Sequence, residues 1–242
     1  MTSEESGNAS VLDIRELRFC RAQKTGSAQG FQLEIERLLL KPGDSVGITG
    51  PSGSGKSTLL DLFALLRAPD VAGGFRFLGT DIVALWKARR ISELDGLRAR
   101  NIGVVLQTGG LLPALSVIEN IMLPRRLLGD HDVAPVIGFL DALGLSGLAH
   151  RLPSQISVGQ RQRVAIARAV AHHPRLILAD EPTAALGRQD ADGAMRLLTD
   201  LARTIGAVLI VVSHDLPMLD RVGLLPLALV DRQGCAVLEQ WP

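Results

Sequence analysis

The chain has 242 residues, of which 47% are hydrophobic and 21% are charged. This composition is globular and excludes a mostly disordered chain. The formal net charge of +1 gives no bulk attraction to DNA, RNA or an acidic membrane surface, so no nucleic-acid partner is expected.

The amino-terminal segment and the cysteines bear on cellular location. Residues 1–10 are small and polar, lack the basic and apolar stretches of a signal peptide, and are expected to form a disordered tail. No apolar run reaches about 20 residues, the length that a transmembrane helix needs. Cys20 and Cys235 match no metal-ligand spacing and indicate no disulfide framework, so a reducing cytoplasm is the simplest setting. If the protein serves a membrane, another polypeptide must span it.

Alternating apolar and polar residues over 11–20 and 31–40 predict two strands, separated by the turn-rich residues 24–30. A tight turn at 41–44 leads into a short strand over 45–49. The next predicted elements are a helix over 57–66, a strand over 73–78, a helix over 89–100 and a buried strand over 102–106.

The pattern changes between residues 108 and 156, where strand signals vanish. Two helical stretches are predicted there, over 117–128 and 133–143, and they are broken by Pro124, Gly129 and Gly144. We interpret 108–156 as a small helical subdomain inserted into an α/β core.

The remaining chain returns to alternating helices and strands. The predicted elements are a helix over 159–172, a strand over 175–180, a helix over 188–204, a strand over 207–212, a short helix near 215–221 and strands at the end. Because strands alternate with helices, the fold class is α/β with a mainly parallel sheet and crossover helices. The core then comprises residues 11–107 and 157–242.

Residues 50–58 read Gly-Pro-Ser-Gly-Ser-Gly-Lys-Ser-Thr and fit the phosphate-binding pattern G-x-x-x-x-G-K-[ST], between an apolar strand and an apolar helix. Glycines let the backbone approach phosphates closely, with N–H groups and the helix N-terminus directed at negative charge. Lys56 is expected to reach the β- and γ-phosphates, and the Ser57 hydroxyl to bind Mg²⁺. The predicted binding residues are Gly50, Pro51, Ser52, Gly53, Ser54, Gly55, Lys56, Ser57 and Thr58.

A second strand, over 175–180, ends in two adjacent carboxylates, Asp180 and Glu181. In a parallel sheet this end of the strand faces the ligand crevice. Adjacent acids at the end of a buried strand are costly unless a cation is near. Asp180 therefore suits a Mg²⁺ ligand, and Glu181 suits the group that orients and polarises the attacking water.

A third strand, over 207–212, leads to Ser213, His214 and Asp215. A lone histidine after a strand is more often a capping or packing residue. Here it lies at another strand end of the same expected sheet, so we favour a contact between His214 and the γ-phosphate.

Three further segments complete a resemblance to the ATP-binding cassette (ABC) ATPases. Residues 156–160, Ile-Ser-Val-Gly-Gln, with the helix that follows, resemble the signature motif of that family. Gln107 stands at the position of its Q-loop, and 182–187 at the position of its D-loop. The motifs occur in the family's order from about residue 11 to 220.

The resemblance implies a P-loop NTPase core in residues 11–242, with an antiparallel β subdomain and the inserted helical subdomain. It implies ATP and Mg²⁺ as cofactors, with Gln107 both a Mg²⁺ ligand and a catalytic residue beside Glu181, His214 and Lys56. It further implies that Ser157, Gly159 and Gln160 bind the ATP held by a partner subunit. Two half-sites of this kind require a head-to-tail, two-fold dimer with a second copy of the chain or a homologous ATPase subunit.

Three departures from the family's pattern matter. Val158 stands where the family usually has a first glycine, and Gly187 replaces the usual D-loop aspartate. The chain contains no tyrosine, so the adenine-stacking tyrosine common in the family is absent. Alignment of the first strand gives its place to Arg21, with Phe19 close by; an arginine plane can stack on a base, and a solvated arginine is equally compatible.

Residues 108–129 resemble the lipoprotein-release and macrolide-export branch of ABC transporters, where this region lies by the groove that grips the membrane subunit. An apolar docking surface or the core of the helical subdomain would both account for four residues there: Leu111, Leu112, Pro113 and Leu115. We therefore expect an ATPase at the inner face of the cell membrane that drives a separate integral membrane permease. The alternatives are a soluble cassette ATPase, acting as an assembly scaffold or DNA-associated motor, and a non-hydrolysing ATP-gated module.

Overall fold

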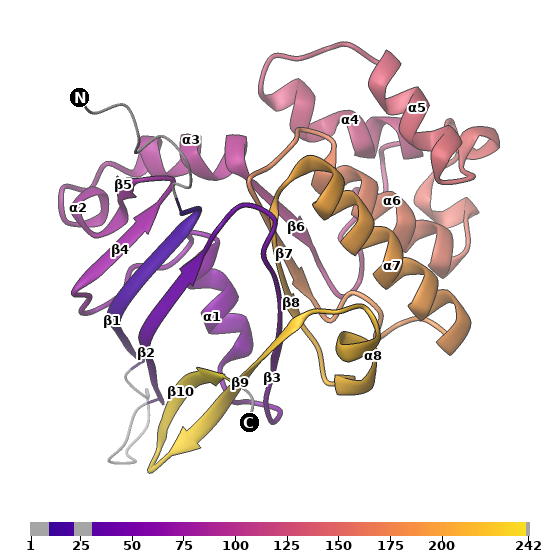
Figure 1. Cartoon of the computed structure of the whole chain (residues 1–242). Coiled ribbons are helices and arrows are strands. Elements are labelled where there is room, and N and C mark those ends of the chain that lie inside the picture. The colour runs from indigo at the N-terminus through magenta and orange to yellow at the C-terminus, as the bar shows by residue number, and fades with distance from the viewer. Residues whose placement is uncertain (1–9, 22–30, 241–242) are drawn as a thin grey trace, which may run out of the picture. The chain divides into compact units, whose positions relative to one another are not determined.

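The computed structural model describes residues 10–21 and 31–240. The expected tail at 1–10 lies outside these residues except for Ser10, as does the expected turn at 24–30. The chain forms two compact units: residues up to 98 together with 212 onward, and residues 99–211 (Figure 1). No helix in the described part of the chain is both long enough and apolar enough to cross a bilayer.

The first unit is built on a mixed sheet in the order β5-β4-β1-β2-β10-β9-β3. β4, β1 and β2 pair antiparallel, which confirms the antiparallel β subdomain, whereas β10 pairs parallel to β2 and β3 pairs parallel to β9. Its strands are β1 (Leu12–Arg21), β2 (Phe31–Leu40), β3 (Ser45–Thr49), β4 (Gly74–Phe77), β5 (Thr80–Asp81), β9 (Leu225–Arg232) and β10 (Cys235–Gln240).

Strand β1 changes its buried face midway. Leu12 and Ile14 are buried, but the next buried residues are Leu17 and Phe19, so the two-residue alternation slips by one. The slip falls at Glu16, which has a left-handed φ of +50° and no partner position in the register with β2. The register with β2 is the same on both sides of Glu16, with Arg15 opposite Arg37 and Leu17 opposite Ile35, so neither strand carries an extra residue. The left-handed backbone at Glu16 keeps both halves of the strand facing the core.

The helix predicted over 89–100 is present over residues 91–101, and a short helix that was not predicted precedes it. α2 (Ile82–Lys87) begins at Asp81, whose carboxylate accepts a hydrogen bond from the amide of Ala84 at 3.0 Å. α3 (Ile91–Asn101) follows after a turn in which Arg89 has a φ of +53°. The first unit also contains α1 (Lys56–Phe63) and α8 (Leu216–Arg221).

The second unit contains three strands in the order β8-β7-β6 and four of the eight α-helices in the described residues (Figure 1). β6 and β7 run parallel, with Val105 opposite Ala179. The strands are β6 (Ile102–Val105), β7 (Leu176–Asp180) and β8 (Val208–Val212). The helices are α4 (Val117–Leu127), α5 (Ala134–Ala142), α6 (Val158–Val170) and α7 (Arg188–Ile205), with 3-10 turns at Ser146–Leu148 and Pro153–Gln155.

Residues 108–156 contain helices and turns without strands, and all of them are described. Pro124 does not end a helix, because α4 continues through it to Leu127. Proline lacks the amide hydrogen of a normal helix residue, so α4 loses one internal hydrogen bond. Burial offsets this cost: Val117, Ile121 and Met122 of α4 belong to an apolar core shared with α5 and α6.

Asn120 fastens the loop before α4. Its side chain is fully buried, and its Oδ1 accepts a hydrogen bond from the Leu112 amide at 2.8 Å. Its Nδ2 lies 3.1 Å from the carbonyl oxygen of Leu112, 2.9 Å from that of Leu115 and 3.0 Å from that of Ser116. Leu111 packs against the core, whereas Leu112 stays 45% exposed. The core interpretation is therefore confirmed for Leu111, and the docking role of Leu112 stays a prediction.

We predict that Asn120→Ala lowers the free energy of unfolding by about 3 kcal/mol, because truncation leaves several buried backbone groups without partners. Urea unfolding followed by circular dichroism measures this. Gln189→Ala, which removes an exposed amide at the start of α7, is the matched control and should change the free energy by about 0.5 kcal/mol or less. Equal effects of the two substitutions would contradict the role of Asn120.

Candidate functional site

The predicted phosphate loop connects β3 to α1, as its motif requires. Gly53 and Gly55 have φ values of +78° and +99°, which residues with a side chain rarely adopt. A Cβ atom on Gly55 would lie 2.2 Å from Cζ of Phe31, whereas one on Gly53 would meet nothing within 4 Å. The loop is therefore fixed against Phe31 on one side and open at Gly53, where a phosphate could approach the backbone.

Lys56 sits within this loop with 8% of its surface exposed. Its Nζ donates hydrogen bonds to the carbonyl oxygens of Gly50 and Pro51, both at 2.8 Å. α1 has no acidic residue in its first turn to neutralise the helix N-terminus. Ser54 adds a buried hydroxyl that has no hydrogen-bond partner among the described residues. A buried cation, an uncompensated helix N-terminus and an unused hydroxyl together suit a polyphosphate.

His214 lies in the same unit as the phosphate loop. The amide of Ser213 donates a hydrogen bond to the carbonyl oxygen of Ile48 in β3 at 3.1 Å, which places His214 beside the strand that enters the loop. Asp215 caps α8 by accepting from the Met218 amide at 3.0 Å. His214 itself is exposed between these two fixed residues.

Gln107 and the two carboxylates belong to the second unit. Val105 pairs with Ala179, so Asp180 at the end of β7 and Gln107 two residues after β6 lie at the same end of two neighbouring parallel strands. Glu181 has a left-handed φ of +45°. For a residue with a side chain this conformation is strained, and such strain concentrates at functional sites.

The signature segment begins α6, as expected. Ser157 is the N-cap: its Oγ accepts from the Gln160 amide at 3.2 Å, and Gln160 Oε1 accepts from the Ser157 amide at 2.8 Å. This capping box uses the Ser157 oxygen as an acceptor and leaves its proton available for donation. Val158 occupies the first helical position and is exposed, so it does not disturb the cap.

Arg168 makes a structural contact next to the candidate site that the sequence analysis did not predict. From α6 its guanidinium donates to the carbonyl oxygens of Gly110 and Gly109, both at 2.8 Å. Burial lowers the pKa of Arg168 from its usual value, yet arginine stays charged at any physiological pH. The signature helix is thereby fastened to the segment that follows Gln107.

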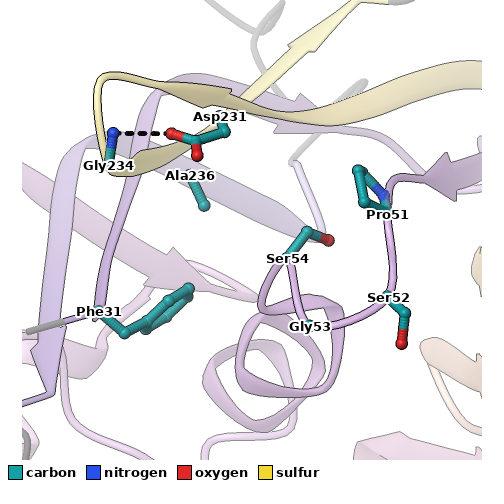
Figure 2. A pocket seen from close by; sticks show the side chains of 8 residues that line it. All are labelled: Phe31, Pro51, Ser52, Gly53, Ser54, Asp231, Gly234 and Ala236. Atoms are coloured by element: carbon teal, nitrogen blue, oxygen red, sulfur yellow. Dashed lines mark hydrogen bonds between the residues drawn. The ribbon is translucent and has the colours of Figure 1, made fainter.

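The two residues considered for base stacking, Arg21 and Phe19, both lie in β1. Phe19 is buried, and Arg67 covers its ring at 5.3 Å from the centroid, so Phe19 belongs to the core. Arg21 is exposed at the end of β1 and is paired with Phe31 at the start of β2. Phe31, which the sequence analysis did not single out, lines a pocket with loop residues 51–54 (Figure 2). A search of aromatic residues at both ends of the β1–β2 connection would have found it.

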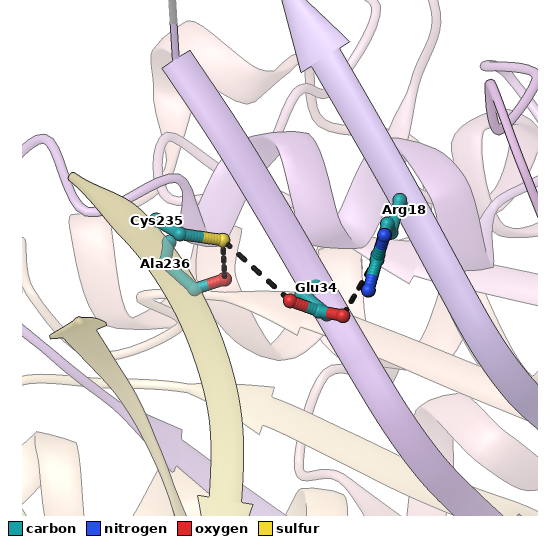
Figure 3. A network of polar contacts seen from close by, with 4 residues as sticks. All are labelled: Arg18, Glu34, Cys235 and Ala236. Carbon is teal, nitrogen blue, oxygen red and sulfur yellow. Dashed lines mark hydrogen bonds and ion pairs between the residues drawn. The ribbon is translucent and has the colours of Figure 1, made fainter. Parts of the chain in front are cut away.

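A polar row crosses β1, β2 and β10 (Figure 3). Arg18 Nε donates to Glu34 Oε1 at 2.8 Å, and the Cys235 thiol lies 4.0 Å from Glu34 Oε2. Burial raises the pKa of the Cys235 thiol, and the negative charge of Glu34 raises it further. Both effects disfavour the thiolate of Cys235, which is the reactive form.

We predict that Glu34→Gln lowers the pKa of Cys235 toward its usual value and increases its alkylation rate. Removing the negative charge favours the thiolate, which is the reactive form. Iodoacetamide labelling across pH 7–10, in a Cys20→Ser background that leaves Cys235 as the remaining cysteine, should show the midpoint moving to lower pH. Glu36→Gln, on an exposed position of β2, is the control. A midpoint that stays fixed or moves upward would refute the assignment.

Comparisons with known proteins agree with this arrangement. The ABC transporter family matches residues 34–184. The chain is 42% identical to the lipoprotein-releasing system ATP-binding protein LolD 1 of Rhodopirellula baltica, over 76% of this chain and 80% of that protein. It is 38% identical to the corresponding LolD protein of Nitrobacter hamburgensis, over 88% and 90%.

A solved structure gives the same picture. The dimeric ATP-binding cassette MJ0796, in a post-hydrolysis state bound to ADP and phosphate, has a TM-score of 0.74 and 30% identity, covering 95% of this chain and 98% of that one. These matches do not favour a soluble, non-transport ATPase. The chain belongs to the ABC transporter family, as an ATP-binding subunit.

Proposed function

We propose that this chain hydrolyses Mg-ATP and thereby drives a separate membrane complex of the lipoprotein-releasing kind. The observation that carries the proposal is the phosphate loop, in which a buried lysine and glycines with left-handed φ surround a helix N-terminus without acidic residues. The names of the relatives support the transport role, and the post-hydrolysis neighbour supports the chemistry.

The roles follow from the chemistry of each group. Lys56 neutralises the β- and γ-phosphates, and His214 contacts the γ-phosphate. Ser57, Gln107 and Asp180 offer only oxygen atoms to a cation, the ligands that Mg²⁺ prefers, and they would hold it. Bound Mg²⁺ would supply charge neutralisation to the phosphates. Glu181 orients and polarises the attacking water.

The signature segment acts on a second copy of the chain or on a homologous ATPase subunit. Ser157 can donate its proton, Gly159 adds no side chain, and the N-terminus of α6 attracts negative charge. Each subunit therefore lacks part of its own site and gains it from the partner in a head-to-tail dimer. The dimeric cassette structure supports this arrangement.

The membrane complex would be contacted through the loop that Asn120 holds. Its amide fixes the backbone of residues 112–116 and leaves the side chain of Leu112 exposed. A rigid loop that presents an apolar side chain suits docking to a permease. The protein would then lie at the inner face of the cell membrane.

A phosphate-release assay tests the enzymatic part. Purified protein should release phosphate from ATP when Mg²⁺ is present and lose this activity when EDTA removes the metal. Phosphate release that is absent under all conditions, with ATP still bound, would point instead to a non-hydrolysing module. Purification from membranes should yield a polytopic partner together with the chain, and Leu112→Asp should reduce that yield without altering phosphate release by the isolated protein.

A further inference from the structure

Asp190 lies where the first turns of α6 and α7 meet. It is the third residue of α7, and Gly159 is the second residue of α6. A Cβ atom on Gly159 would lie 3.4 Å from Oδ2 and 3.6 Å from Oδ1 of Asp190. Both helices belong to the second unit. The carboxylate of Asp190 therefore stands against the signature segment.

The N-terminus of α6 has no acidic residue of its own. Its first turn follows the N-cap Ser157 and contains Val158, Gly159 and Gln160. The N-terminus of a helix carries partial positive charge and attracts an anion within the first turn. In the proposed dimer that anion is the γ-phosphate held by the partner subunit. In the single chain, the carboxylate of Asp190 already lies in the same field.

The charge of Asp190 is neutralised only in part. Arg163, one turn further along α6, brings its Nη2 to 4.0 Å from Asp190 Oδ1, which is longer than a charge-assisted hydrogen bond. The side chains of Arg163 and Asp190 are 41% and 59% exposed, so water weakens their attraction. Much of the negative charge therefore still acts on an anion that approaches α6.

We propose that Asp190 competes with the partner's γ-phosphate for the N-terminus of α6 and thereby limits the affinity with which two ATP-bound subunits close. This inference rests on the proposed function, in which the signature segment binds ATP held by the partner. The carboxylate repels an incoming phosphate and favours reopening of the dimer. Because Asp190 is exposed, the effect is about 3-fold at each signature segment. A two-fold dimer has two such segments, so its dissociation constant changes by about 10-fold.

Sedimentation equilibrium of the full chain with saturating Mg-ATP tests the proposal, in a Glu181→Gln background that blocks hydrolysis. Asp190→Asn and Asp190→Ala both remove the charge, and each should lower the dissociation constant of the dimer by about 10-fold at about 0.05 M salt. The gain should shrink at about 0.5 M salt, because screening then acts over a shorter distance. Asp200→Asn, at an exposed position of the same helix, is the matched control and should leave the constant unchanged.

A purely structural role of Asp190 predicts the opposite sign. Loss of an acidic residue from the first turn destabilises α7, which would weaken the closing of the dimer. An unchanged or higher dissociation constant in Asp190→Asn, a gain that persists in full at high salt, or an equal gain in Asp200→Asn would overturn the assignment. Failure of the proposed function looks different: the Glu181→Gln parent then binds no ATP, or binds it and stays monomeric.

Discussion

Glu181→Gln is expected to lower the rate of phosphate release by about 100-fold to 1,000-fold while ATP stays bound, because the amide cannot accept a proton from the attacking water. With hydrolysis blocked, ATP remains between the signature segment of one subunit and the phosphate loop of the other. An ATP-dependent dimer should therefore accumulate. Size-exclusion chromatography with light scattering, with and without Mg-ATP, measures it.

The Glu181→Gln substitution is expected to change the chemistry at this position without changing the local backbone. Its left-handed φ of +45° belongs to the turn after β7, and glutamine keeps the side-chain length and the backbone demand of glutamate. Glu36→Gln makes the same chemical change on an exposed position of β2 and should leave both the rate and the oligomeric state as in the wild type. A Glu181→Gln protein that stays monomeric with ATP would count against the closing of a dimer.

Lys56→Ala should weaken ATP binding by about 100-fold, because a buried charge-assisted contact to the phosphates is lost. Phosphate release should fall to background at ordinary ATP concentrations. Calorimetric titration with Mg-ATP measures the affinity.

Two controls accompany this substitution. Lys41→Ala removes an exposed lysine at the turn before β3 and should not alter ATP affinity. Lys56 also bonds the carbonyl oxygens of Gly50 and Pro51, so thermal unfolding of Lys56→Ala must show that the fold persists. A folded variant with wild-type affinity would remove Lys56 from the site.

Much of the fold could be predicted from periodicity and motifs. The phosphate loop and the strand that ends at Asp180 depend on neighbouring residues, and the structure has them at the predicted positions. The sequence did not predict features of the fold in which a single residue changes the local backbone. Glu16 within β1 and Arg89 between α2 and α3 are left-handed positions with ordinary side chains, which composition does not reveal.

At Pro124 the local sequence predicts a helix break that the structure does not have. Local preference argues for a helix break there, but the apolar core around α4 outweighs the loss of one hydrogen bond. Tertiary contacts that the chain forms later thus decide an element that the local sequence predicts otherwise.

In the candidate site, too, some residues could be predicted from motifs and others depend on tertiary contacts. Residues that meet the nucleotide through a motif, such as Lys56, could be predicted, and their assigned roles remain proposals. Asn120, Arg168 and Phe31 could not, because the first two act through hydrogen bonds to backbone carbonyls of distant loops and the third through a pocket. Every residue type has a backbone carbonyl oxygen, so no pattern of residue types identifies the partners of these hydrogen bonds.

The most direct test of the account is the affinity of the purified wild-type chain for ATP with Mg²⁺ supplied. Titration calorimetry should give saturable binding of one ATP per chain, with inorganic tripolyphosphate competing for the same site. An absence of heat and of competition at millimolar ATP, from a protein shown to be folded, would contradict the claim that residues 50–58 bind a nucleotide.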